Sequence, residues 1–481
     1  MRLQTIAVLA GAALVLTGCN LAPRYKIPTT EVPTAYKEAG DWQPAAPADT
    51  LQRGPWWEIY GDKTLNDLEA QVDTGNPTLA AATAAYERAR SFVAEASAGF
   101  FPHIETDGQL SADKQSANRP LRGGGEPTYY DANFLGAQAS YELDLWGRVR
   151  NSVAAGRDAA QASAADFQNV RLMLHAELAE DYVAMRGMDE EAKLLNDTVA
   201  AYTRAHQLTQ NLFEGKIASL IDVTRAQTQL QDAQAQVSDI VARRALFEHA
   251  IATLIGKPPS QLSLAPDVAQ IAVPEVPAGL PSTLLQRRPD IASAERRVAA
   301  ANQVIGVARA AFFPTISLTG TAGYQGTNID LLQLPNHYWS IGPGMSLPLF
   351  EGGLLRAKLQ AARADFEEAS GDYRATVLKA FREIEDNLVL LHWLEKEAQQ
   401  EQAAAHAAQQ TLDMSMSLYQ NGADSYLDVV TAQTSALVAQ REVLALQTRR
   451  IQASIGLVRA LGGGWSTGQL PGPGAVSVAM Q

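Results

Sequence analysis

The sequence of 481 residues has a single cysteine, few aromatic residues and fewer basic than acidic side chains. With 39 Lys and Arg against 52 Asp and Glu, the net charge of -13 disfavours a nucleic-acid partner, because phosphate binding requires a basic face. Aromatic residues make up 7% of the chain while alanine is abundant, which favours long, closely packed helices over a bulky core. Beyond the N-terminus no apolar run approaches the length of a membrane-spanning helix, so any further membrane crossing would require β-strands.

Patterns that carry catalysis are also missing. The seven histidines are dispersed, and none stands at a metal-ligand spacing from a carboxylate or a cysteine. The glycine run at residues 123–125 is not followed by Lys-Ser or Lys-Thr, so it is not a phosphate-binding loop, and no nucleophile elbow is present. We therefore expect a protein without enzymatic activity, cofactor or metal site.

The N-terminus has the pattern of a lipoprotein signal peptide, predicted to span residues 1–18. Arg2 is followed by an apolar run that is too short to cross a bilayer, and Leu16-Thr17-Gly18-Cys19 matches the bacterial lipoprotein cleavage box. Cleavage there would leave an acylated Cys19 at the new N-terminus; the alternative is an ordinary cleaved signal with an incidental cysteine. The next residue is Asn20 and not the aspartate that retains lipoproteins at the inner membrane, which favours the outer membrane.

The chain contains two copies of one large unit. Residues 76–102 reappear as 288–314, with Phe-Phe-Pro closing both, and residues 212–228 return as 418–434. The copies lie about two hundred residues apart, unlike the short periods of solenoid repeats. Two similar halves are therefore expected to build one body together.

Two stretches in each half alternate between apolar or small residues and polar ones, which predicts β-strands. They cover residues 104–112, 135–143, 316–324 and 339–347. Strands of about ten residues can cross a membrane at a tilt, but four cannot close a membrane barrel, since about eight is the smallest number. The barrel would therefore be shared among subunits. The alternative is a soluble antiparallel sheet with one wet face, which has the same alternation.

A very long helical stretch follows each strand pair. No proline occurs at residues 148–211 or 351–470, and apolar residues in the second stretch follow a coiled-coil seam. Glycine-containing turns at residues 214–219 and 421–425 each end in a serine that can cap the next helix. Each half should therefore form a long antiparallel helical hairpin with its tip away from the strands. The alternative of a plain coiled-coil rod leaves the strands unexplained.

Several short motifs follow one another over nearly the whole chain. They are Cys19 with Ala22-Pro23-Arg24-Tyr25, then Trp56-Trp57-Glu58-Ile59-Tyr60, both Phe-Phe-Pro elements, Leu143-Asp144-Leu145-Trp146-Gly147-Arg148, Arg287-Arg288-Pro289-Asp290-Ile291, Leu347-Pro348-Leu349-Phe350 with Gly352-Gly353, and Ala460-Leu461-Gly462-Gly463-Gly464-Trp465. In this order they make the chain resemble the TolC-like outer-membrane efflux channels of Gram-negative bacteria. The resemblance is to the lipidated, NodT-type branch that serves resistance-nodulation-division (RND) pumps.

The resemblance implies an α+β membrane protein built from duplicated units, each a strand hairpin plus a long helical hairpin. A homotrimer with four strands per subunit would form a twelve-stranded β-barrel among outer-membrane lipids, continued by a long periplasmic coiled-coil barrel of α-helices. The implied function is a passive, gated exit duct for drugs or other small toxic compounds, delivered by an inner-membrane RND pump through a periplasmic adaptor protein. The alternatives are an exit channel for type I protein secretion, and a structural or adhesive coiled-coil surface protein without a pore.

The expected domains follow the duplication. In order, they are the signal peptide (1–18), a proline-rich arm (19–63), a first efflux repeat (64–286), a second efflux repeat (287–464) and a tail (465–481). Within the repeats, strands are expected at about 102–145 and 314–349, and helical hairpins at about 148–256 and 351–462.

In such channels the periplasmic tips close the pore, and the resemblance carries this role to the tip of the second half. Leu427 would be the constriction residue, with Asp424, Asp428 and Tyr419 beside it. Thr431 stands where many relatives have an acidic residue, so part of the expected acidic ring is missing.

At the tip of the first half, Asp222 and Arg225 are the corresponding polar candidates. For Asp222 and Asp428 the alternative is a solvated acid in the first turn of a helix, where it favours the positive end of the helix dipole. The candidates for contact with the adaptor are the turn residues of both tips: Gly215, Ser219, Gly422 and Ser425.

Overall fold

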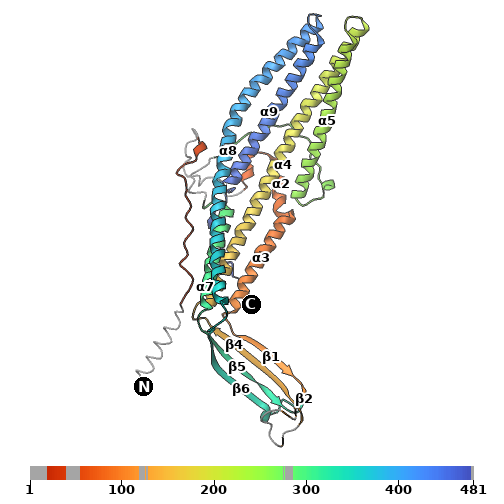
Figure 1. The fold of residues 1–481 in the computed structure, drawn as a ribbon. Helices are drawn as coiled ribbons and strands as arrows, with labels where there is room; N and C mark the ends of the chain where they lie inside the picture. The colour runs from red at the N-terminus through yellow and green to blue at the C-terminus, as the bar shows by residue number, and fades with distance from the viewer. Residues whose placement is uncertain are drawn as a thin grey trace.

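The computed structural model of the chain describes residues 19–39, 55–116, 118, 125, 128–274, 276 and 285–477. The signal peptide expected at residues 1–18, residues 40–54 of the proline-rich arm, residues 123 and 124 of the glycine run and residues 478–481 of the tail lie outside the described residues. Long helices occupy one end of the molecule and a β-sheet occupies the other (Figure 1).

Helices and strands occur in the same order in the two halves. The first half contains α3 (Pro77–Ala98), β1 (His103–Gln109), β4 (Asn133–Leu143), α4 (Arg148–Glu214) and α5 (Leu220–Leu254). The second half contains α7 (Pro289–Ala310), β5 (Thr315–Gly326), β6 (His337–Ser346), α8 (Leu354–Gln420) and α9 (Tyr426–Ala460). The paired helices have equal lengths: 22 residues in α3 and α7, 67 in α4 and α8, and 35 in α5 and α9. The predicted duplication is therefore present in the fold.

Local signals explain where the helices begin. In α3, the side chain of Asn76 accepts a hydrogen bond from the Leu79 N–H at 3.0 Å, and Pro77 stands where its missing N–H costs nothing. A straight helix of 67 residues is about 100 Å long, so α4 and α8 reach far beyond the size of a compact domain. The other helices are α2 (Lys63–Gly75) and short 3-10 helices at Lys37–Ala39, Trp56–Tyr60, Pro259–Gln261, Leu334–Asn336 and Thr467–Gln469.

The four long strands form one antiparallel sheet in the order β1-β4-β5-β6. Their register joins apolar or small residues on one face and polar residues on the other. One row of paired residues reads Ile104, Ala139, Gly320 and Ile341, and the adjacent row reads Glu105, Gln138, Thr321 and Ser340. The alternation predicted for each strand therefore continues across the sheet as two distinct faces.

The first strand pair is less regular than the sequence suggests. The first strand ends at Gln109, and the chain then forms the short strand β2 (Ala112–Lys114), which pairs with β3 (Tyr129–Asp131) in a separate sheet. At the break, the Ser111 N–H donates to Asn133 Oδ1 at 3.2 Å. A side-chain amide thus replaces the backbone partner that an uninterrupted strand would have had.

Residues 19–39 of the arm are largely extended and run along the helices (Figure 1). Two side chains of α7 hold its backbone. Arg309 donates to the Leu21 carbonyl at 3.1 Å, and Asn302 donates to the Pro23 carbonyl at 2.9 Å. The arm is therefore attached to the second repeat by specific hydrogen bonds.

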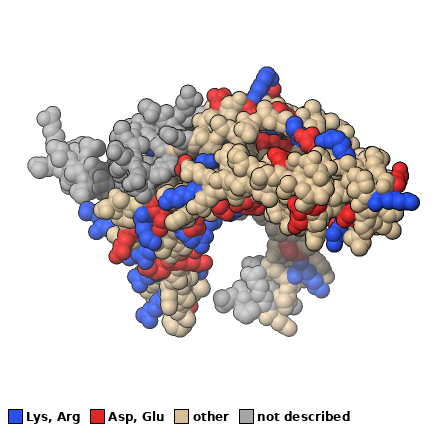
Figure 2. Space-filling view, turned by 90° about the horizontal axis from the view of Figure 1, so that it is seen from above, with Lys and Arg blue, Asp and Glu red and all other residues tan. Residues whose placement is uncertain are grey.

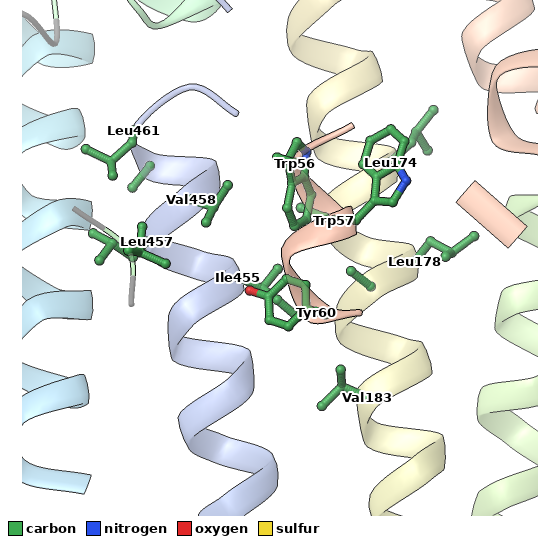
Figure 3. Packing of buried hydrophobic residues seen from close by; sticks show 14 of the residues in the cluster. Trp56, Trp57, Tyr60, Leu174, Leu178, Val183, Ile455, Leu457, Val458 and Leu461 are labelled. Carbon is green, nitrogen blue, oxygen red and sulfur yellow. The ribbon is translucent and has the colours of Figure 1, made fainter. Parts of the chain in front are cut away.

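The main hydrophobic core lies where η2 (Trp56–Tyr60) is inserted between α4 and α9 (Figure 3). Three buried aromatic residues of this short helix, Trp56, Trp57 and Tyr60, belong to one cluster with aliphatic side chains of both long helices. The aliphatic members of the cluster on these two helices include Leu174, Leu178, Val183, Ile455 and Val458, with Leu457 and Leu461 on the opposite side of α9 from the aromatic residues. The Tyr60 hydroxyl also lies 2.8 Å from Ser454 Oγ, so this last part of the arm joins the two halves through apolar and polar contacts.

Seen from above the helical tips, the body is curved and hollowed on one side (Figure 2). The helices next to the sheet are arranged as the strands are, because α3 packs on α4, α4 on α7, and α7 on α8. This order leaves α3 beside the β1 edge of the sheet and α8 beside the β6 edge. Among the described helices, none combines the length and the apolar character needed to cross a membrane.

Candidate functional site

The polar face of the sheet is the first candidate surface for transport. On it, Glu142 is paired with Arg148 through bonds of 2.8 and 2.6 Å, and Glu105 lies 3.6 Å from His103. Asp107 has neither a hydrogen bond nor an ion pair within the described part of the chain. The face therefore carries uncompensated negative charge, which favours cations over anions in a pore.

The second-half tip is a compact turn closed by short hydrogen bonds. Gly422, with a φ of 71°, donates its N–H to the Tyr419 carbonyl at 3.0 Å. Ser425 caps the next helix, and its Oγ donates to Asp428 Oδ2 at 2.6 Å. Hydrogen bonds from Ser425 lower the pKa of the Asp428 carboxyl. The Ser425 N–H donates to Asp424 Oδ1 at 2.7 Å, so both candidate acids help to shape the turn.

The first-half tip achieves the same turn with a different residue. Ser219 caps α5, accepting from the Ile221 N–H at 3.3 Å, while its own N–H donates to Asp222 Oδ2 at 3.2 Å. Three residues before this serine the left-handed position is occupied by Lys216, with a φ of 60°, since Gly215 stands one place earlier than the glycine of the other tip. The candidate Gly215 is therefore not the residue that takes the left-handed conformation.

A small aromatic cluster joins the two tips. Tyr419 is 7% exposed and Tyr426 is 1% exposed, and their ring centroids lie 5.0 Å apart. They pack with Ala226 of the first half and Val429 of the second. Burial and the negative charge of Asp222 raise the pKa of Tyr419. Tyr419 thus lies between the two helical hairpins, where it fixes one against the other.

The remaining gate candidates lie in different surroundings. Leu427 is 49% exposed at the start of α9, and Thr431 Oγ1 donates to its carbonyl at 2.9 Å. Its sequence neighbours Asp424 and Asp428 belong to the same turn. Arg225, by contrast, makes no hydrogen bond or ion pair within the described ranges. The structure therefore brings Leu427 and the two acids together, places Tyr419 near Asp222, and leaves Arg225 apart.

Cys19 is exposed and lies at the junction between sheet and helices. Its carbonyl accepts a hydrogen bond from Arg150 at 3.4 Å, near the start of α4. It also lies against Gly147, where an added Cβ would come within 3.1 Å of the Cys19 carbonyl oxygen. Gly147 has a φ of 76°, so both its conformation and the close approach of the arm favour glycine there.

One buried polar group was not predicted from the sequence. Glu69 of α2 is fully buried, and its Oε2 lies 2.6 Å from His175 Nδ1 of α4. The His175 ring also stacks on Trp57, with ring centroids 4.3 Å apart, and its Nε2 lies 3.2 Å from Asp73. Burial raises the pKa of Glu69 to about 7. No spacing rule links residues 69 and 175, so only a structure could pair them.

Comparison with known proteins finds relatives of one kind, outer-membrane efflux proteins. A family model described as outer membrane efflux protein matches residues 70–257 and 280–463. The chain is 31% identical to the antibiotic efflux pump outer membrane protein ArpC of Pseudomonas putida, over 97% of each chain. It is 32% identical to the solvent efflux pump outer membrane protein SrpC of the same species, over 95% of this chain and 98% of the relative.

The solved structures include the outer-membrane channel OprN, which is 28% identical to this chain. The two superpose with a TM-score of 0.84, over 93% of this chain and 100% of OprN. The overall fold of the chain is therefore shared with an outer-membrane channel. On the family match over both repeats and the full-length similarity to ArpC and SrpC, the chain belongs to the outer membrane efflux protein family.

Proposed function

We propose that three copies of this chain form the outer-membrane exit duct of a tripartite efflux system. The observation that carries this proposal is the sheet, which has one apolar face, one polar face and two unpaired edge strands, β1 and β6. Four strands cannot close a membrane barrel, because about eight is the smallest number. Three copies supply twelve strands, with the apolar face toward lipid and the polar face lining the pore.

The duct is passive and has no catalytic step. An inner-membrane RND pump selects and drives the compounds, and a periplasmic adaptor joins that pump to the helical tips. The adaptor-contact candidates are the turn residues Gly215, Ser219, Gly422 and Ser425. The names of ArpC and SrpC refer to antibiotic and solvent efflux, which supports small toxic compounds as the cargo. Acylated Cys19 anchors each copy in the outer membrane at the level where the helices meet the sheet.

The gate of the duct is assigned to the second-half tip. Leu427 is a half-exposed leucine in the first turn of α9, flanked by Asp424 and Asp428. The aromatic cluster of Tyr419 and Tyr426 fixes the backbone from which it projects. Three such leucines, one per copy, would close the end of the helical barrel by apolar contact and exclude water.

Planar-bilayer conductance of the purified protein tests both the duct and the gate. The variants are Leu427→Ala and the double change Asp424→Ala with Asp428→Ala. The first half offers a matched control, because Ile221 stands in its tip where Leu427 stands in the second and is 58% exposed. A small resting conductance that rises in Leu427→Ala and stays low in Ile221→Ala is the expected result.

The other outcomes separate the two claims. If all variants conduct as freely as the parent, the duct stands but Leu427 does not gate it. If Ile221→Ala opens the pore and Leu427→Ala does not, the gate belongs to the first-half tip. A verified trimer without any conductance would refute the duct and favour an adhesive surface protein.

A further inference from the structure

The duplicated sequence repeats an aromatic residue at the corner where a strand leads into a long helix. After β4 the chain reads Leu143-Asp144-Leu145-Trp146, and after β6 it reads Leu347-Pro348-Leu349-Phe350. The two corners share the order leucine, any residue, leucine, aromatic. Each long helix, α4 or α8, begins shortly afterwards. Trp146 and Phe350 are therefore equivalent positions of the repeat.

In the first half, the aromatic residue at this corner packs against residues of the same chain. Trp146 stacks on Phe313, with ring centroids 4.8 Å apart and planes inclined by 28°. Its Nε1–H donates to the Pro314 carbonyl at 2.8 Å. Phe313 and Pro314 belong to the Phe-Phe-Pro element that leads into β5, the strand hydrogen-bonded to β4. The aromatic residue after one strand thus packs on the Phe-Phe-Pro element before the neighbouring strand.

In the second half, the aromatic residue at the same corner has no ring partner among the described residues. Phe350 is 90% exposed, and β6, which it follows, is an edge of the sheet. At the opposite edge, Phe101 of the first Phe-Phe-Pro element is 58% exposed just before β1. The chain therefore presents one half of an aromatic pair at each edge of its sheet.

We propose that Phe350 of one copy stacks on Phe101 of the next copy, as Trp146 stacks on Phe313 within a copy. The inference rests on the proposed trimeric duct and names a contact that joins its subunits. Strand direction supports it. In the sheet, β1 runs away from the helices, as β5 does, and β6 runs back toward them, as β4 does (Figure 1). Pairing β6 with β1 of the next copy would therefore be antiparallel, like every other pair in the main sheet.

The helices fit the same arrangement. Within the chain α4 packs against α7, the helix that precedes the neighbouring strand β5. The equivalent partner of α8 is α3, and α3 and α8 lie at opposite ends of the helix order. Stacking Phe350 on Phe101 would bring α8 of one copy beside α3 of the next. Strand pairing, aromatic stacking and helix packing would then all join the same two neighbouring copies. An aromatic ring that is 90% exposed in one copy would then be buried.

Cysteine cross-linking in the full-length lipoprotein tests the contact. The double variant Phe101→Cys with Phe350→Cys is treated with a short bismaleimide reagent in outer membranes, and the products are separated after boiling in detergent. Acylated Cys19 has its sulfur blocked and does not react. Covalent dimers and trimers are expected from the double variant and from neither single variant. The matched control, Trp146→Cys with Phe313→Cys, should cross-link within a chain and stay at the monomer mass.

A second measurement needs no cysteine. The temperature at which the purified oligomer dissociates should be lower for Phe350→Ser than for the parent. It should rise in Phe350→Trp, because the indole N–H can then donate to the Pro102 carbonyl of the next copy as Trp146 donates to Pro314. If Phe350 instead faced lipid, the serine and tryptophan variants would dissociate at the same temperature as the parent, and the double cysteine variant would remain monomeric after cross-linking.

These outcomes separate the contact from the duct itself. A parent protein that is trimeric by native mass spectrometry, with no cross-link and no shift in dissociation temperature, overturns the aromatic contact and leaves the proposed function standing. A parent that is monomeric in the membrane overturns the proposed trimeric duct and the contact together.

Discussion

Replacing Glu69 by glutamine should flatten the dependence of stability on pH. Glu69 is fully buried, and burial raises its pKa from 4.5 to about 7. A carboxyl whose pKa is raised by folding stabilises the fold when protonated, so its contribution is complete below about pH 4.5 and is lost as the pH rises through about 7. The parent should therefore be more stable at pH 5 than at pH 8.

The size of the effect follows from the shift. One pKa unit corresponds to about 1.4 kcal/mol, so the change from 4.5 to about 7 gives an upper value of about 3.5 kcal/mol per subunit. This net shift already includes the opposing effect of His175, whose Nδ1 lies 2.6 Å from Glu69 and which favours the ionised carboxylate. Glutamine keeps the shape of glutamate but cannot ionise, so most of this pH dependence should disappear in Glu69→Gln.

Thermal unfolding followed by tryptophan fluorescence at a series of pH values measures this directly. Trp57 stacks on the His175 ring, so its emission reports on the same site. The matched control is Asp67→Asn on the same helix, because the side chain of Asp67 is 63% exposed and its ion pair with Lys63 lies at the surface. That variant should keep the slope of the parent. If Glu69→Gln also keeps it between pH 5 and pH 8, the buried carboxyl does not titrate there and the reasoning is wrong.

Variants at three further sites, one of them with a matched control, test other features of the structure. Gly256→Ala should lower the yield of folded protein and its melting temperature, because Gly256 has a φ of 73° and an added Cβ would come within 2.0 Å of the Gly75 carbonyl oxygen. The control Gly371→Ala should be neutral or slightly stabilising, because a Cβ added there would have nothing within 4 Å. Tyr419→Phe should leave the melting temperature unchanged, because its buried hydroxyl has no hydrogen-bond partner in the described part of the chain. Tyr419→Ala should destabilise the tips by about 3 kcal/mol or more through the cavity that it creates. Cys19→Ser should abolish acylation, and persistent incorporation of radioactive palmitate would contradict the assigned lipid anchor.

The sequence predicted the architecture well where the pattern is periodic. Alternation at residues 316–324 and 339–347 assigned the residues of both strands to the correct faces of the sheet, since each residue of a strand can point to only one of two faces. The long helices were predicted from absent prolines and from a seam of apolar residues. Their ends were predicted from the glycine turns, and Gly422 does adopt the positive φ that favours glycine, whereas in the first half Lys216 takes that conformation in place of Gly215.

Features that depend on contacts between distant segments could not be read in this way. Tyr419 was predicted to lie beside Leu427 at the gate, but its burial against Tyr426 and Ala226 could not be predicted, because Ala226 belongs to the other hairpin. The pairing of Glu69 with His175 is another example, since nothing in either local sequence marks a buried charge. The break after Gln109 depends on a side chain of Asn133, which a count of alternating residues does not include.

The equal lengths of the paired helices restrict how this protein can change. Because α4 and α8 both have 67 residues and α5 and α9 both have 35, the two tips end at the same height above the sheet. Inserting one heptad into each helix of a single hairpin would raise its tip by about 10 Å and separate Ala226 from Tyr419 and Tyr426. Insertions or deletions in the helices of one repeat should therefore be tolerated only with a matching change in the other. The length of the helical part can then change in evolution only when both repeats change together.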